Sequence, residues 1–336
     1  MCKLNTVNNT IYIAVIIFIS LAVYKTLMQI HVGNFEELSA AAHGVLEGKP
    51  HWRAYQNRLL GPYIVYLISL IGISYLGALK VYILIMITFQ NIILFTLMRK
   101  IEISPRTSIS WVIIFSFIFV MVQHRWFYTW DSLDVVIFTF FAFGIFQSKS
   151  LNYFLVLFFI GLLNRESALF ISLYIVIDSF YFESIKKIHL KSTKKLIIGI
   201  CLIVFGIIYI KVIRDYLFIS QINGAFDKDH EIIGNHIYLI KNIKDLFLHN
   251  IFTLNIINSA FILGSISYFV YFVRSYEDSQ IKGLIIYCAI IANILIFGLL
   301  NETRMYIILI PFILFFEISK NNLIFASSRG ANSAQR

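Results

Sequence analysis

The sequence predicts an all-α protein: a polytopic transmembrane helical bundle of about ten spans, with a long outer first loop. Composition is the first reason, because 59% of the 336 residues are hydrophobic and only 14% are charged. Soluble domains average about 45–50% apolar and about 25% charged residues. The mean hydropathy of +0.80 is the second reason. The third is that apolar runs recur along the whole chain without strict alternation, which favours helices over a barrel.

The apolar runs define the individual spans. A helix needs about 20 residues to cross the hydrocarbon core of a bilayer. A further run, 59–75, is either another span or a helix at the surface. We predict one transmembrane domain over 1–319 and a polar cytoplasmic tail over 320–336. The ten clear runs are 10–30, 78–98, 108–123, 132–147, 151–163, 167–182, 196–213, 251–273, 282–300 and 305–319.

The distribution of Lys and Arg decides the role of 59–75. The net charge is +10, and basic residues of membrane proteins collect on cytoplasmic loops. A membrane-embedded chain makes nucleic acid a remote partner for this charge. If 59–75 does not cross, the most basic segment, 185–195, faces the cytoplasm together with both termini. We therefore predict that 59–75 is an outer juxtamembrane or re-entrant helix of a multi-pass plasma (inner) membrane protein.

Two long polar loops then lie on the outer, or periplasmic, side. The first loop covers 31–77 and the second covers 214–250. The second half of the second loop, 233–247, has the amphipathic spacing of a surface helix. Most mixed clusters of acids, bases and aromatic residues fall on the same side, whereas the inner loops are mostly simple basic runs. We therefore expect an active site that faces outward.

The first loop contains a predicted helix that starts near Asn34. Glu36 and His43 fall on its polar face, opposite an apolar stripe. A carboxylate on that face suits a general base, and Glu36 is the preferred candidate. Glu37 has a second interpretation, because Asn34 followed three residues later by Glu forms a capping-box pattern.

The run RAYQNRLLGPY follows at 53–63. Arg58 can bind a phosphate through two parallel hydrogen bonds, and Gln56 and Asn57 beside it can orient a substrate. The alternative is interfacial anchoring, which Trp, Tyr and Arg side chains also provide. That alternative fits Tyr63 better than it fits Arg58.

Asp131 and Asp134 open the fourth predicted span, one helical turn apart. They share a helix face, so they can hold a divalent cation or orient a sugar. The alternative is N-capping, with Asp131 as the cap. Arg125 and several aromatic residues precede them and suit a phosphate and a carbohydrate, or a membrane interface.

Two short acid–base turns complete the set of motifs. Asn164, Arg165 and Glu166 interrupt one apolar stretch, and Glu302 and Arg304 precede the last span. Ionisable residues at such breaks are costly unless they are paired or functional. Either turn alone is also explained as a polar connection between spans, but two on one membrane face favour a functional role.

In their order, these motifs resemble the GT-C superfamily of polytopic glycosyltransferases, especially its small bacterial members. The resemblance implies inverting transfer of a sugar from a polyprenyl-phosphate donor, and a catalytic carboxylate on the first outer loop. The family commonly has Asp at the start of the loop helix, where this chain has Asn34, so Glu36 or Glu37 takes its place. The matching pieces are Glu36/Glu37, 40–48, 55–62, Asp131/Asp134, 164–166 and 302–304.

The resulting hypothesis is a membrane glycosyltransferase with a glycan or lipid-linked acceptor. A carboxylate removes the proton of the acceptor hydroxyl, and arginines neutralise the departing phosphate. A divalent cation at Asp131 and Asp134 is an open option, not a requirement. The proposed residues are Glu36 and Glu37 as catalytic; Arg58, Arg125, Arg165 and Arg304 for the phosphate; and His43, Gln56, Asn57, Asp131, Asp134, Asn164, Glu166 and Glu302 for orienting the substrate.

Two alternatives stay open at this point. One is a polymerase or ligase of lipid-linked surface polysaccharide, which shares the substrate class and an outward site. The other is a transporter or flippase of lipids or glycans. Transporters tend to place ionisable groups near the membrane midplane, whereas here the charges crowd one face, which favours an enzyme.

Overall fold

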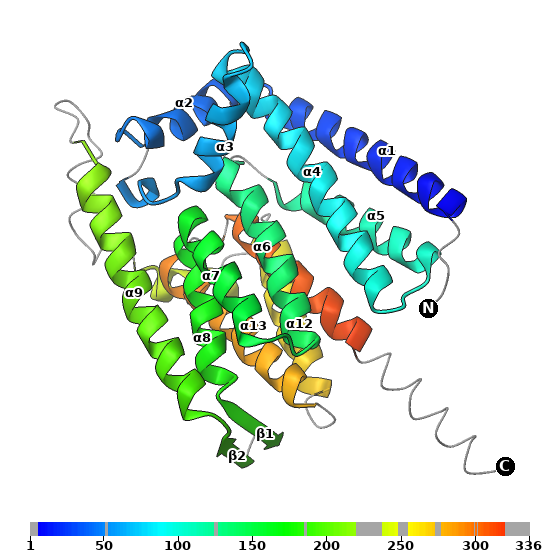
Figure 1. Cartoon of the computed structure of the whole chain (residues 1–336), viewed down its shortest axis with the longest axis vertical. Coiled ribbons are helices and arrows are strands. Elements are labelled where there is room, and N and C mark those ends of the chain that lie inside the picture. The colour runs from blue at the N-terminus through cyan, green and yellow to red at the C-terminus, as the bar shows by residue number, and fades with distance from the viewer. Residues whose placement is uncertain are drawn as a thin grey trace.

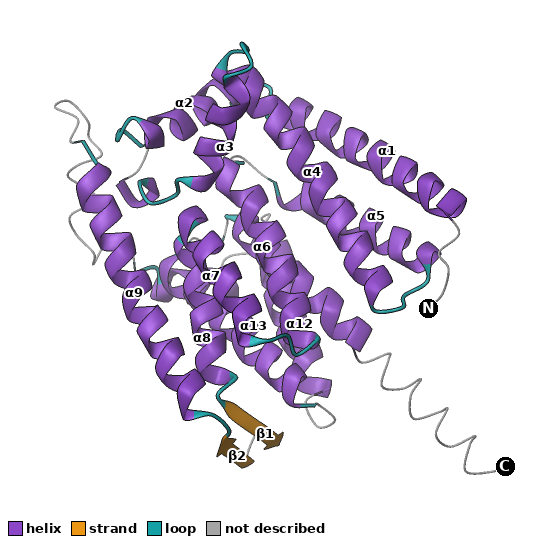
Figure 2. Ribbon diagram, viewed as in Figure 1, coloured by secondary structure: helices purple, strands orange, loops and turns teal. Residues whose placement is uncertain are grey.

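The computed structural model describes residues 6–50, 53–123, 127–184, 187–219, 237–247, 255–272, 277–298, 300 and 302–319. Within these residues the fold is helical apart from one small hairpin (Figure 2). The elements in chain order are α1 Thr6–Ile30, α2 Phe35–Leu46, η1 Arg53–Tyr55, α3 Leu60–Ser69, α4 Tyr75–Lys100, α5 Pro105–Val122, α6 Thr129–Phe146, α7 Leu151–Asn164, η2 Glu166–Ala168, α8 Leu169–Ile177, β1 Phe180–Ser184, β2 Lys187–Leu190, α9 Thr193–Leu217, α11 Leu239–Phe247, α12 Asn255–Phe272, α13 Asp278–Phe297 and η5 Thr303–Leu309, which continues as a helix over 310–319.

Helix α6 is the centre of the bundle. Every side chain of this helix except that of Phe140 is buried, because α3, α4, α7, α13 and η5 all pack against it. A helix that is apolar on all sides belongs in a protein interior. Burial extends to its first turns, so Asp131 and Asp134 lie inside the protein and not on a lipid-facing surface.

Helices α1, α4 and α5 form a separate layer beside this centre (Figure 1). A buried polar contact joins them: Asn91 Nδ2 donates to Ser20 Oγ at 3.0 Å, and Ser116 Oγ donates to Asn91 Oδ1 at 3.2 Å. The neutral polar residues inside the spans therefore hold helices together.

Replacing Asn91 with Leu is expected to destabilise this layer by about 1–2 kcal/mol, because hydrogen bonds between membrane helices are each worth about 0.6 kcal/mol and at most about 1.7. Unfolding in detergent, followed by circular dichroism, measures the effect. Thr88→Val is the matched control, since Thr88 Oγ1 donates only to Leu84 O of its own helix. Equal stability of the two variants would contradict the role of Asn91.

Six of the described helices are long and apolar enough to cross a membrane, namely α1 from Thr10, α4, α5, α6, α9 and α13. Each of the ten predicted spans contains helix, but the count of ten is not confirmed. Helix α7 has 14 residues and α8 has 9, which is about 21 Å and 14 Å at 1.5 Å per residue. The predicted span 167–182 is also interrupted, because its last residues belong to β1.

The first loop is largely helical. Helix α3, within 59–75, has 10 residues, or about 15 Å, which fits the prediction of a juxtamembrane helix better than that of a span. Helix α2 ends at Leu46, and two residues later Gly48 has a φ of +73°, which favours glycine. A Cβ at Gly48 would lie 2.3 Å from Leu217 O of α9, and Ile219 N donates to Gly48 O at 2.7 Å. The end of α9 is thus fastened to the first loop.

The sequence-based prediction missed the hairpin in the most basic segment. Strands β1 and β2 pair antiparallel, with Phe180 opposite Leu190 and Phe182 opposite Ile188. In Figure 1 the hairpin lies at the end of α8 and α9 that is remote from α2 and α3. The amphipathic helix predicted over 233–247 is present as α11 from Leu239, and the earlier part of that range lies outside the described residues.

Candidate functional site

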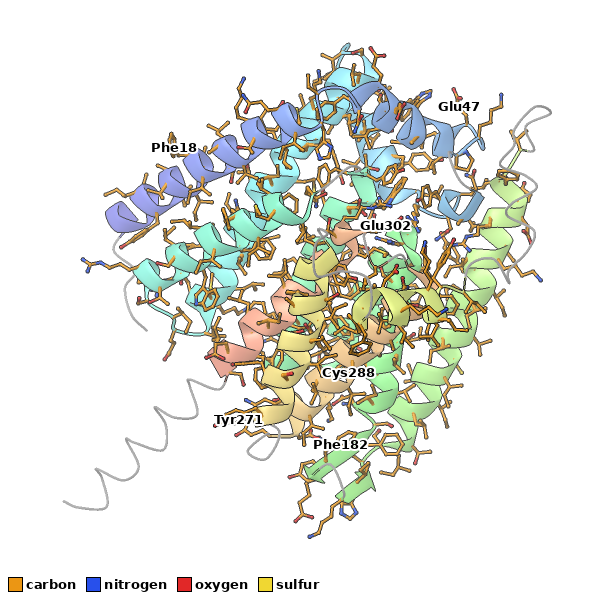
Figure 3. The ribbon with its side chains drawn as sticks, turned by 180° about the vertical axis from the view of Figure 1, so that it is seen from behind. Phe18, Glu47, Phe182, Tyr271, Cys288 and Glu302 are labelled. Atoms are coloured by element: carbon orange, nitrogen blue, oxygen red, sulfur yellow. The ribbon has the colours of Figure 1, made fainter. Side chains whose placement is uncertain are left out.

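The candidate site is a charged network where α3, α6, α7, α9 and η5 meet. Among the described residues it contains four arginines (Arg58, Arg165, Arg214 and Arg304) and four carboxylates (Asp131, Asp134, Glu166 and Glu302). Figure 3 shows Glu302 toward the same end of the bundle as Glu47 of the first loop, and Phe182 at the opposite end.

The first half of the network surrounds Asp131 and Asp134, which are almost fully buried. Arg165 Nη1 lies 3.3 Å from Asp131 Oδ1 and 3.2 Å from Asp134 Oδ2. Arg304 Nη1 lies 3.3 Å from Asp131 Oδ2. Each aspartate therefore faces a guanidinium, which offsets the cost of burying its charge.

Neutral groups donate further hydrogen bonds to these aspartates. Asn164 Nδ2 and Ser167 Oγ donate to Asp134 Oδ1 at 2.9 and 3.1 Å. The backbone N–H of Tyr128 donates to Asp131 Oδ2 at 3.0 Å. Asp131 is thus the third residue of α6 and not its cap, and Asp134 does not cap the helix; the predicted capping arrangement is wrong by three positions.

The second half of the network surrounds Glu166. Arg58 Nη2 lies 2.5 Å from Glu166 Oε1, and Arg58 Nε lies 3.4 Å from Glu166 Oε2. Arg214 Nη2 lies 3.6 Å from Glu166 Oε2, and Arg214 Nε donates to Asn57 Oδ1 at 2.8 Å. Burial alone would raise the pKa of the Glu166 carboxyl, but Arg58, Arg214 and Arg165 outweigh it and lower that pKa well below its usual value. Glu166 is therefore ionised and is a weak base.

An aromatic wall holds two of the guanidinium groups. The rings of Tyr128 and Trp130 are stacked with centroids 4.6 Å apart, and Tyr55 meets both. The Arg58 guanidinium carbon lies 4.2 Å from the Tyr55 ring centroid, and that of Arg304 lies 4.6 Å from the Tyr128 centroid. These cation–π contacts fix the arginines in place.

A pocket of about 350 Å³ lies beside the network, which contributes Arg165 and Glu166 to its lining. Arg165, Glu166 and Ser167 line its polar end, and the rest of the lining is almost entirely apolar. The apolar walls come from α8, α9, α13 and η5, with Asn293 as a neutral polar member. They contain Leu169, Phe170, Leu173, Ile203, Ile290, Ile294, Met305 and Ile308.

Two buried polar atoms beside the network lack a hydrogen-bond partner among the described residues. They are Nε1 of Trp130 and Oδ1 of Asn164, on side chains with no exposed surface. Buried polar atoms are normally paired with protein, water or ligand. These two atoms are therefore available to a water molecule or a substrate group.

The structure brings most of the predicted site residues together. Arg58, Asn57, Asp131, Asp134, Asn164, Arg165, Glu166, Glu302 and Arg304 all belong to the network or contact it directly. Arg125 lies outside the described residues. Four further candidates in the first loop, Glu36, Glu37, His43 and Gln56, have other positions.

Glu36 and Glu37 are exposed in the first turn of α2. No hydrogen bond or ion pair in the described part of the chain joins them to the network. Gln56 Nε2 donates to Val45 O at 2.8 Å and so ties the other end of α2 to the loop before Arg58. Glu37 lies about 12 Å along the helix from Val45 at 1.5 Å per residue. The catalytic role of Glu36 and Glu37 stays a prediction.

The capping-box interpretation of Glu37 is not supported, because the Asn34 side chain makes no capping hydrogen bond. His43 lies apart from the network as well. Its Nδ1 is 3.3 Å from Glu47 Oε1, and its ring meets Tyr75 edge-on. His43 therefore contributes to packing between α2 and α4 in this structure.

The optional cation at Asp131 and Asp134 stays a prediction. Their oxygens accept from arginine, asparagine, serine and backbone donors. Within the described residues, no group of three or more His, Cys, Asp or Glu side chains is placed to hold a metal. A cation at this position would have to displace Arg165 from both aspartates.

Sequence reasoning missed Arg214 and Ser167. Arg214 stands at the end of an apolar run, where a single arginine is commonly an interfacial anchor, so no local signal marked it. Comparisons with protein-family models, with curated proteins and with solved structures found no match to this chain.

Proposed function

We propose that this protein is an integral membrane glycosyltransferase that moves a sugar from a polyprenyl-phosphate donor to a glycan or lipid-linked acceptor. The observation that carries the proposal is the position of the charged network at the head of an apolar pocket. A lipid-linked phosphate has the same division into an anionic head and an apolar chain. The chain would lie along the apolar walls, and the phosphate would meet the arginines around Glu166.

In the proposed reaction, the oxygen of an acceptor hydroxyl bonds to the anomeric carbon of the donor sugar. The bond between that carbon and the phosphate oxygen breaks, and polyprenyl phosphate leaves with the bonding electron pair. A carboxylate takes the proton of the hydroxyl. Arg58 and Arg165 stabilise the negative charge that develops on the leaving phosphate.

The charge balance of the network shapes this proposal. The four arginines of the network are matched by four carboxylates, so a phosphate must compete with a carboxylate for its arginines. Among the carboxylates that pair with Arg58 or Arg165, Glu166 is the most suited to give way, because its side chain is 34% exposed whereas those of Asp131 and Asp134 are 2% exposed. We propose that Glu166 holds Arg58 and Arg214 in position until the donor arrives.

Two sets of carboxylates suit the role of base. Glu36 and Glu37 are exposed on α2, but no hydrogen bond or ion pair within the described residues joins them to the network. Glu302 is 38% exposed, and its Oε2 lies 3.6 Å from Arg304 Nη2. Glu302 therefore combines solvent access with a place in the network, and we propose it as the first alternative to the loop glutamates.

Mass spectrometry of surface and lipid-linked glycans tests both the function and the base. Cells that lack the protein are expected to lose one sugar increment from a glycan, and the wild-type gene should restore it. General base removal typically costs about 10²–10⁴ in rate, so the variant that lacks the base should restore little. Glu302→Gln is compared with Glu36→Gln/Glu37→Gln, and whichever restores the increment fully is not the base.

Two outcomes of the same experiment would reject the proposal. One is an unchanged glycan profile in cells that lack the protein. The other is a complete lipid-linked glycan that accumulates without reaching the cell surface, because that result indicates a flippase instead of a transferase. Glu47→Gln serves as the control for losing an exposed loop carboxylate, since Glu47 pairs only with His43 in the described residues.

A further inference from the structure

The β-hairpin and the start of α9 expose apolar and basic side chains. By the register of the strand pair, Ile188 and Leu190 lie on one face of the hairpin, 51% and 52% exposed, and Tyr181 lies on the other face, 46% exposed. Lys187 is exposed at the start of β2, Lys191 directly after β2, and Lys194 in the first turn of α9. Lys187 Nζ lies 3.5 Å from the carboxylate of Glu183, which is also exposed, and a surface ion pair of this kind is weak.

The hairpin is fixed to the bundle by buried and partly buried charges. Asp278 Oδ1 accepts the backbone N–H of Phe182 at 2.8 Å. Lys282, which is 2% exposed, lies between Asp278 Oδ2 at 2.6 Å and Asp178 Oδ1 at 2.9 Å. Lys195 also pairs with Asp178. This cluster ties the end of α8 to the starts of α9 and α13.

Backbone hydrogen bonds add to this attachment. The N–H groups of Lys191 and Ser192 both donate to Ser179 O, at 2.7 and 3.0 Å. Ser192 Oγ accepts from Lys195 N and caps α9. The exposed side chains of the hairpin therefore project from a backbone with a defined position, which lowers the ordering cost of binding.

We propose that this hairpin is a binding surface for anionic phospholipid headgroups, in the leaflet at the end of the bundle opposite the charged network. Both features of the surface favour binding at the membrane interface, because apolar side chains insert below the headgroups and lysines extend toward the phosphates. Charge complementarity selects anionic over zwitterionic lipids. In this proposal, the partly buried cluster of Asp178, Asp278, Lys195 and Lys282 holds the hairpin at the depth of the headgroups.

The three exposed lysines provide the electrostatic attraction to anionic lipid in this proposal. A lysine near an anionic surface strengthens membrane binding roughly fivefold. The three lysines together therefore influence the choice of lipid more than the apolar residues do. High salt weakens such attraction because it screens exposed charges. Lipid selectivity and salt sensitivity are therefore the two signatures of this surface.

The test measures how far the hairpin is shielded by lipid. The full chain is placed in nanodiscs of phosphatidylcholine alone or of an equal mixture with phosphatidylglycerol. Its cysteines, Cys2, Cys201 and Cys288, are replaced by Ser, and Leu190 is replaced by Cys. We expect a water-soluble maleimide to label residue 190 at least about fivefold more slowly in the mixture. High salt should remove the difference.

Two triple variants separate this surface from the total charge of the protein. Lys187→Gln/Lys191→Gln/Lys194→Gln is expected to abolish the lipid dependence of labelling. Lys49→Gln/Lys241→Gln/Lys244→Gln removes the same charge from exposed positions outside the hairpin and should preserve it. Equal labelling in both lipids would overturn the proposal, as would a lipid dependence that survives in the hairpin variant or is lost in both variants.

Discussion

Replacing Arg165 with Met is expected to destabilise the protein by about 3–5 kcal/mol. Arg165 pairs with both Asp131 and Asp134, whose side chains are 2% exposed. Removing one partner of a buried ion pair leaves an uncompensated charge, and this costs about 3–5 kcal/mol. The lower part of the range applies here, because Arg304 still faces Asp131 and Asn164 still donates to Asp134. Unfolding in detergent or a thermal midpoint measures the change.

The control for this prediction is Arg106→Met. Arg106 is exposed in the first turn of α5, and exposed substitutions usually change stability by no more than about 0.5 kcal/mol. Adding Asp134→Asn to Arg165→Met should recover part of the lost stability, because it removes the carboxylate charge that Arg165→Met leaves without its guanidinium partner. If Arg165→Met and Arg106→Met are equally stable, the network does not hold the bundle together.

Replacing Arg58 with Lys is expected to lower the rate of sugar transfer about 10²–10³-fold while the fold is kept, given the proposed function. That is the usual loss when a preorganised donor to a developing anion is removed. Lysine retains the positive charge, but it lacks the planar pair of N–H donors and the face that lies against the Tyr55 ring. The rate is measured in membranes or by restoration of the missing sugar increment in cells.

Arg214→Lys is the matched control for Arg58→Lys. Arg214 contacts the same Glu166, but its side chain is 28% exposed, against 5% for Arg58, and the contact is longer. We expect a loss of about tenfold for this variant, since an exposed contact contributes less to electrostatic stabilisation. Full transfer by Arg58→Lys would show that the phosphate is bound elsewhere, provided that both variants melt like the wild type.

The sequence was sufficient to predict the helical class, a helix within 59–75 and most members of the charged network. These follow from short-range signals: apolar runs, breaks in those runs, and charges at the breaks. Asn164, Arg165 and Glu166 stood out because ionisable residues rarely interrupt an apolar stretch without a reason. The same argument selected Arg304 and Glu302 before the last span.

The pairing of these residues could not be predicted in the same way. Arg304 and Asp131 are 173 positions apart, and which arginine faces which carboxylate depends on how helices pack around α6. Arg214 was missed because a single arginine at a helix end has an ordinary interfacial explanation. The hairpin was missed because basic residues at 185–195 suggested a simple loop, whereas pairing with 180–184 depends on a turn without a strong sequence signature.

The structure also changes which residues of the first loop are the stronger functional candidates. Sequence patterns singled out Glu36 and Glu37, but α2 exposes both and is fastened through its other end, by Gln56 and Gly48. Burial cannot be judged from a polar stripe alone, because the same stripe suits a helix that simply faces water. The loop instead supplies Arg58 and Asn57, which the bond from Gln56 to Val45 helps to position.

The paired charges lie far apart in the sequence, and this has a consequence for how the bundle assembles during synthesis. Ribosomal synthesis delivers Asp131 first, its partner Arg165 soon after, and Arg304 only near the end of the described chain. Until η5 is inserted, Asp131 lacks its second guanidinium, and the partly built bundle carries an incompletely neutralised acid at its centre. Closure of the bundle thus awaits its last helix, so a nascent chain truncated before residue 304 is expected to be a substrate for membrane quality control.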